Sequence, residues 1–81
     1  MRGLALAVVE AFVVLELSND DEIDPDVAVR GMENIAAHLV SLGDGDQRAL
    51  RAEFAAIASA STDPAHAQFA SEVADMVGLV R

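Results

Sequence analysis

The longest apolar stretch of the chain covers residues 4–17, and only two glutamates interrupt it. On a helix that turns 100° per residue, this stretch has two apolar faces rather than one. The first face carries Leu4, Val8, Phe12 and Leu15. The second face carries Leu6, Val9, Val13 and Leu17, with Glu10 and Glu16 at the borders between the two. The abundant valine would also suit a buried strand, but fourteen residues exceed the length of an ordinary strand.

The pattern therefore predicts a first helix over residues 3–17. A helix with two apolar faces needs two covering surfaces. It either runs through the centre of its own domain, or another chain covers its second face. The sequence leaves open which of the two faces looks inward.

An Asp-Pro pair marks the start of a second helix, predicted over residues 25–42. The Asp24 side chain can accept the free amides of a first turn, and Pro25 lacks an amide that would have no partner there. The apolar positions then form one seam at spacings of 4, 3, 4 and 3: Ala28, Met32, Ile35, Leu39 and Leu42. Gly31 within this helix indicates a close approach of another helix, and Gly43 is expected to end it.

A third helix is predicted over residues 46–60, with Leu50, Phe54 and Ile57 facing inward. Either Asp44 or Asp46 can cap it, and an Asp44 cap with Gln47 three residues later resembles a capping box. On the outer side we expect Arg48, Arg51 and Glu53.

Asp63-Pro64 repeats the capping signal and predicts a fourth helix over residues 64–79. Its inward positions follow the spacings 4, 3 and 4: Phe69, Val73, Met76 and Val80. Gly78 indicates a frayed end.

The sequence thus predicts an all-α fold, a compact four-helix domain like an up-down bundle, with a hydrophobic first helix that is central or interface-forming. The 81 residues are enough for one domain with one core. The short connectors favour antiparallel packing of consecutive helices. One phenylalanine on each of three helices is expected to fill a common core: Phe12, Phe54 and Phe69.

The composition is acidic, with fourteen Asp and Glu against five arginines, no lysine and a net charge of −9. This balance argues against nucleic acid and against an anionic membrane surface as partners, because both bind basic surfaces. It is compatible with docking on a basic protein, although acidic charge also keeps a small apolar protein in solution. Because there is no cysteine, disulfides and thiolate chemistry are excluded.

Arg2 followed by an apolar run has the order of a signal peptide. However, Glu10 and Glu16 break the run, and no clean cleavage site follows it. The run is also too short and too charged to cross a bilayer. We therefore expect a cytoplasmic protein, and the alanine-rich, lysine-free composition is typical of a GC-rich bacterial genome.

Five carboxylates lie close together after the first predicted helix: Asp20, Asp21, Glu22, Asp24 and Asp26. They do not form a calcium loop of the EF-hand type, because with Asp20 in the first position the required glycine is Pro25. A loop that begins at Asp44 would place Arg48 among the ligands. We interpret the five carboxylates either as an acidic docking patch or as a solvated loop with a helix cap.

Residues typical of catalytic and metal sites occur only in isolation. His38 and His66 lack the spacings that place two metal ligands on one helix face. No serine lies in a glycine-flanked elbow, and no glycine-rich phosphate loop is present. We therefore expect no catalytic residue, no metal ion and no cofactor, and a protein that is not an enzyme.

Two functions remain, and both can hold together. The first is a homodimer with a structural or regulatory role, in which the second face of the first helix forms a twofold interface: Leu6, Val9, Val13 and Leu17. The alternative is an interaction or inhibitor module that docks its acidic patch on a basic protein partner. In size, charge and helical class the chain resembles bacterial immunity proteins and antitoxins, which neutralise a basic partner enzyme, although no motif is shared.

Overall fold

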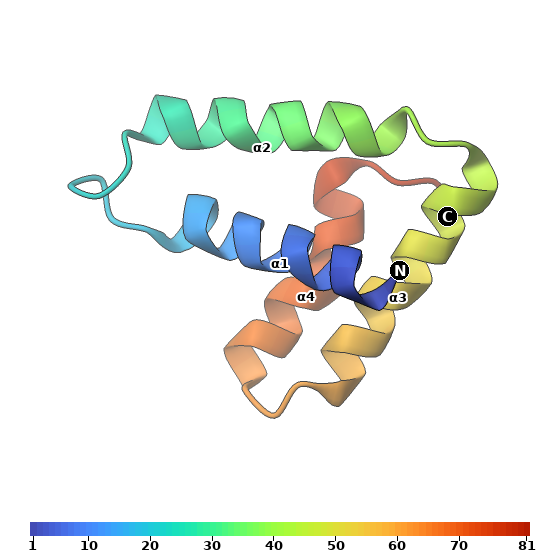
Figure 1. Ribbon diagram of the computed structural model, residues 1–81. Coiled ribbons are helices and arrows are strands. Elements are labelled where there is room, and N and C mark those ends of the chain that lie inside the picture. Colours follow the sequence, from blue (N-terminus) through green and yellow to red (C-terminus); the bar gives the residue numbers. More distant parts are fainter.

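The computed structural model describes all 81 residues and consists of four helices joined by short connectors (Figure 1). The helices are α1 (Arg2–Leu17), α2 (Pro25–Val40), α3 (Asp44–Ala60) and α4 (Pro64–Val77). No strand is present, so the predicted all-α, four-helix fold is confirmed. None of the four helices combines the length and the apolar character that crossing a membrane requires.

The helices form two hairpins that cross each other (Figure 1). α1 and α2 run side by side in opposite directions, and so do α3 and α4. α1 lies across the second hairpin and contacts all three other helices, whereas α2 and α3 barely touch. α1 is therefore the helix that joins the two hairpins, but its outer side stays exposed, so the first alternative for this helix holds for one side only. Consecutive helices pack antiparallel only within each hairpin, because the chain turns steeply between α2 and α3.

The core is formed chiefly by α3, α4 and one side of α1. α4 contributes five buried residues and α3 four, whereas α2 contributes only Ala28. The three phenylalanines belong to one buried cluster, as predicted: Phe12, Phe54 and Phe69. Ala5, Ala70 and Ala74 lie in the same cluster, and side chains this small let crossing helices approach closely.

The inward side of α1 corresponds to neither predicted face but to the border between them. Its buried residues are Ala5, Val9 and Phe12, which are 0%, 0% and 2% exposed. At 100° per residue these three lie within about 60° of one another. Because Val9 has no exposed surface, the predicted dimer interface cannot form as one face. Of its other members, Val13 packs against the core, while Leu6 and Leu17 are 39% and 63% exposed.

The two Asp-Pro capping signals are confirmed. An Asp24 carboxylate oxygen accepts a hydrogen bond from the Asp26 amide at 2.8 Å, and Asp63 accepts one from the Ala65 amide at 2.9 Å. The predicted cap of α3 is wrong, because Gly43 is the residue before the helix and no side chain caps it.

The glycines have different roles from those predicted, with one exception. Gly43 has a φ of −62° and does not end α2, whose last residue is Val40. Gly78 does end α4, with a φ of 84° in the left-handed region. Because the next residue, Leu79, is buried, this end of the helix is not frayed as predicted. The exception is Gly31, where an added Cβ would lie 3.3 Å from Leu15 Cδ1, as expected for a close approach.

Candidate functional site

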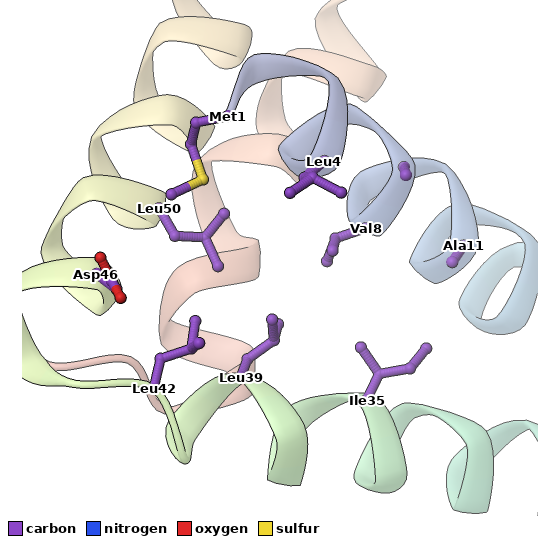
Figure 2. A pocket seen from close by; sticks show the side chains of 10 residues that line it. Met1, Leu4, Val8, Ala11, Ile35, Leu39, Leu42, Asp46 and Leu50 are labelled. Carbon is purple, nitrogen blue, oxygen red and sulfur yellow. The ribbon is translucent and has the colours of Figure 1, made fainter.

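The main concavity of the molecule is an open groove between α1, α2 and the start of α3 (Figure 2). It has a volume of about 540 Å³, and nine of its ten lining residues are hydrophobic. From α1 and the residue before it come Met1, Leu4, Ala7, Val8 and Ala11. From α2, its end and α3 come Ile35, Leu39, Leu42, Asp46 and Leu50. We call this surface the α1–α2 groove.

The groove exists because nothing covers this side of the first hairpin. α1 and α2 approach closely where Leu15 meets Gly31, and the chain then turns α3 away from α2. Ala7 and Ala11 are too short to fill the space that remains. As a result Leu4 is 71% exposed at the edge of the groove, although leucine is usually buried.

One side of α1 carries three of the groove residues and extends the apolar surface beyond the groove to Val14. At 100° per residue its members lie within about 80° of one another: Leu4, Ala7, Ala11 and Val14. Leu4, Ala7 and Val14 are exposed, and Ala11 is half-buried. This set is the unpartnered apolar face of α1, in place of the face predicted from the sequence. The signal that could have found it is the pair of alanines, which the sequence analysis left out of both faces.

Charge surrounds this apolar surface. Asp46 is the one polar residue in the wall of the groove, and Asp44 lies two residues before it in the first turn of α3. The predicted acidic patch lies on the connector and first turn at the far end of the α1–α2 hairpin, with all five side chains exposed: Asp20, Asp21, Glu22, Asp24 and Asp26. None of the five forms an ion pair within the chain, and Asp24 also caps α2.

Most of the acidic charge has no cationic partner within the molecule. Of the fourteen carboxylate side chains, only three are in ion pairs, which leaves eleven. Those three are Glu53 with Arg2, Asp75 with Arg51 and Arg81, and Glu10 with His66. Three of the five arginines are therefore already paired, so the surface field is strongly negative.

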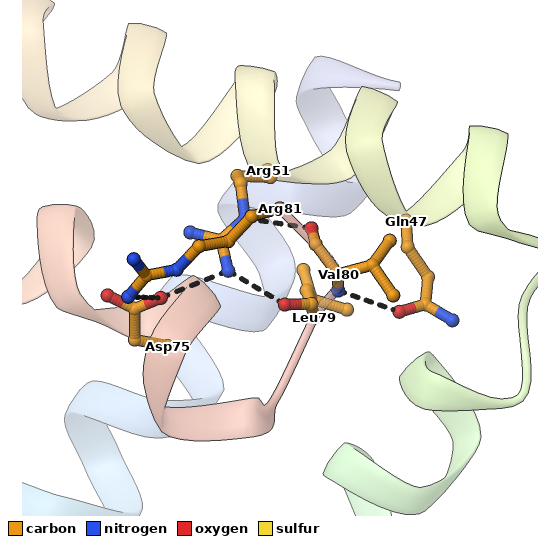
Figure 3. A network of polar contacts seen from close by, with 6 residues as sticks. All are labelled: Gln47, Arg51, Asp75, Leu79, Val80 and Arg81. Atoms are coloured by element: carbon orange, nitrogen blue, oxygen red, sulfur yellow. Dashed lines mark hydrogen bonds and ion pairs between the residues drawn. The ribbon is translucent and has the colours of Figure 1, made fainter.

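Gln47 is the one buried polar residue, and it does not belong to the predicted capping box. Its amide nitrogen donates to the Val40 and Leu42 carbonyl oxygens at 3.0 and 2.7 Å. Its amide oxygen accepts from the Val80 amide at 3.0 Å (Figure 3). Gln47 thus joins the end of α2, the start of α3 and the segment after α4, and it fixes the steep turn that opens the groove.

Arg51 holds the same C-terminal segment from a neighbouring turn of α3 (Figure 3). It donates to the Leu79 carbonyl oxygen at 2.8 Å and to the Val80 carbonyl oxygen at 3.0 Å, and it lies 3.0 Å from an Asp75 oxygen. The predicted solvent-facing role of Arg51 is therefore wrong, because its half-buried side chain serves as a structural clamp. These contacts join residues about thirty positions apart in the chain, which helix periodicity does not detect.

One serine does have a histidine beside it. Ser61 Oγ lies 3.3 Å from His66 Nδ1, and His66 Nε2 lies 3.3 Å from a Glu10 carboxylate oxygen. The Glu10 side chain is 65% exposed, so water competes for its contact with His66. The α4 amides of Ala65 and His66 both donate to Asp63, so they are not free to stabilise an oxyanion. These contacts attach α1 to the start of α4.

The other isolated candidates stay apart. His38 is exposed on α2, and no group of three or more His, Asp or Glu side chains is arranged to hold a metal ion. No protein-family model, no curated protein and no solved structure matches the chain.

Proposed function

We propose that this protein is a non-catalytic interaction module, which acts by binding an amphipathic helix of another protein in the α1–α2 groove. The observation that carries the proposal is the groove itself, an open apolar surface of about 540 Å³ with Leu4 exposed at its edge. Exposed apolar surfaces of this kind mark interaction sites in proteins of this size. The groove runs between two helices, which is the geometry that receives the apolar face of a third.

The lining of the groove favours protein side chains over a small polar ligand. Small-molecule sites combine an apolar wall with several placed polar groups that fix the orientation of the ligand. Here Asp46 is the one polar group in the wall. A row of aliphatic side chains on a helix needs no more than apolar contact, and α1 and α2 supply it on both sides.

A titration with a peptide tests the proposal. The chain has no tryptophan and no tyrosine, so a single tryptophan in a designed peptide reports binding without background. The probe is a helix of about five turns, or ~18 residues, with leucine on one face and glutamine on the other. We expect its tryptophan emission to shift to the blue on binding, as the indole leaves water.

Two matched variants locate the binding site. Leu4→Glu places a charge at the edge of the groove and is expected to weaken binding by about tenfold or more, because burial of one leucine is worth about 1.5–3 kcal/mol. Leu17→Glu makes the same change on the same helix at a residue outside the groove and is expected to leave binding unchanged. Equal losses in both variants, or no binding by any leucine-faced helix whatever the charge of its polar face, would overturn the proposal.

A homodimer remains a second candidate, and the outer face of α1 favours it. Leu4, Ala7 and Ala11 in the groove wall form one apolar strip with Val14 outside it, so α1 of a second copy could pack there. Light scattering after size exclusion tests this directly. A dimer that Leu4→Glu dissociates and Leu17→Glu preserves would support self-association through the groove, whereas a monomer at all concentrations would contradict it.

A further inference from the structure

We infer that the helix bound in the α1–α2 groove is cationic and places a lysine or arginine side chain against Asp46. This inference rests on the proposed function and names the chemistry of the partner. Three observations lead to it: the position of Asp46 in the groove wall, the acidic residues at both ends of the first hairpin, and the shortage of free cations within the chain.

Asp46 gives the most direct argument. It lies in the wall of the groove with aliphatic neighbours, among them Leu42 and Leu50 (Figure 2). Its carboxylate is exposed to solvent. A helix that covers the groove removes part of that solvent, and a carboxylate that loses water without gaining a partner opposes binding. A cationic side chain from the bound helix supplies that partner through a charge-assisted hydrogen bond, which is stronger than the bond that a neutral amide donates.

The other acidic residues of the chain also favour a basic helix, and they act over a longer range than Asp46. Asp44 and Asp46 lie at one end of the first hairpin, and the acidic patch of residues 20–26 lies at the other. Eleven carboxylates have no ion-pair partner, while three of the five arginines are used within the chain. A basic helix is therefore attracted to this surface, by Asp46 at the groove itself and by the acidic patch from farther away, and an acidic helix is repelled.

The same charges disfavour two other occupants. A second copy of this chain carries a net charge of −9, so its charge opposes association even though Arg30 and Arg48 form no ion pair within the chain. A fatty acid or an anionic lipid brings a negative headgroup, which the Asp46 carboxylate in the groove wall and the net charge of −9 repel. A basic amphipathic helix fits both the apolar wall and the acidic surroundings.

Three peptides that share one leucine face and one tryptophan test the inference. Their polar faces carry lysine, glutamine or glutamate. We expect the lysine peptide to bind at least about tenfold more tightly than the glutamine peptide, and the glutamate peptide to bind most weakly. Raising the salt from 0.1 to 1 M shortens the Debye length from about 10 to about 3 Å, so it should weaken the lysine peptide and leave the glutamine peptide nearly unchanged.

The variant Asp46→Asn separates the contact between Asp46 and the bound helix from the attraction due to the net negative charge of the protein. Without the charge, the lysine peptide should lose roughly threefold to tenfold in affinity, while the glutamine peptide should bind more tightly because no carboxylate is desolvated. Glu72→Gln removes one charge from an exposed position of α4 outside the groove and is the control for net charge. It should change the affinity of neither peptide by more than about twofold.

The outcomes separate this inference from the proposed function. Equal affinities for the lysine, glutamine and glutamate peptides, all sensitive to Leu4→Glu, would overturn the inference and leave the groove as a helix-binding site. If Asp46→Asn changes the affinity for the lysine peptide no more than Glu72→Gln does, the inference is likewise overturned and the groove remains a helix-binding site. A dimer that strengthens with salt and excludes all three peptides would overturn both, and would identify a second copy as the occupant.

Discussion

The two helical hairpins of this protein differ in how completely they are packed. α3 and α4 contribute nine of the fourteen buried residues, and α2 contributes one. The second hairpin also carries the Gln47 and Arg51 clamp, in which every buried polar side-chain atom has a hydrogen-bond partner. The first hairpin instead exposes large apolar side chains, and it forms the α1–α2 groove.

This difference separates stability from binding. The α3–α4 hairpin, with the inner side of α1, supplies the core that holds the fold. The outer parts of α1 and α2 add little to that core, so their apolar residues are available for contact with another molecule. Apolar residues that add little to the core and remain at the surface are typical of interaction sites. The predictions below test this separation, from the largest expected effect to the smallest.

Phe54 tests the core directly, since it is 1% exposed at the centre of the second hairpin. Phe54→Ala is expected to cost about 3–5 kcal/mol, because it removes a buried ring and leaves a cavity. Ile35→Ala, on the half-buried groove side of α2, should cost about 1–2 kcal/mol, as only part of that side chain leaves water. Urea denaturation followed by circular dichroism measures both. Phe54→Leu keeps the protein measurable if the alanine variant does not fold, and equal costs at Phe54 and Ile35 would contradict the separation.

Gln47 tests the polar part of the same region. Gln47→Ala leaves the Val80 amide and two carbonyl oxygens without their partner, and we expect a loss of about 1–3 kcal/mol. Gln68→Ala is the control, because the exposed Gln68 side chain bonds only to Glu72 on the same helix, and the free energy of unfolding should change by no more than about 0.5 kcal/mol. A Gln47 variant as stable as the Gln68 variant would show that the clamp does not hold the turn.

The parts of the fold that follow from local rules could be predicted from the sequence. Both Asp-Pro caps, the four helices and the close approach at Gly31 depend on residues near one another in the chain or on a single periodicity. The seam of α2 was also found, and Ala28 is its buried member.

What the sequence does not determine is how the two hairpins are oriented. Because α1 has two apolar faces, the sequence does not show which side faces the core. In the structure the core-facing side lies between the two faces, at the small residue Ala5. Gln47 and Arg51 bond to residues far along the chain, so no local pattern reveals them. The groove depends on both features, and for that reason the candidate site could not be derived from the sequence.

Two glycines, one at each end of the second hairpin, are expected to change the stability in opposite directions when replaced by alanine, and by less than the core variants. Gly78 has a φ of 84°, so Gly78→Ala forces a side chain into the left-handed region, at a cost of about 1–2 kcal/mol. Gly45 lies in the first turn of α3 with open space around its Cα, so Gly45→Ala should stabilise by up to about 1 kcal/mol. Urea midpoints that move in the same direction for both variants would contradict the left-handed role of Gly78.

The smallest effect on stability is expected where we propose the binding site. Leu4 is 71% exposed, so Leu4→Glu removes little buried surface, and the free energy of unfolding should change by no more than about 0.5 kcal/mol. Leu17→Glu, at 63% exposure, should behave in the same way in the same urea titration. If Leu4→Glu instead costs as much as Ile35→Ala, the groove end of α1 belongs to the folding core. A weaker peptide affinity would then reflect unfolding rather than a lost contact. If both leucine variants keep their stability and only Leu4→Glu loses the peptide, that residue serves binding and is not needed for folding.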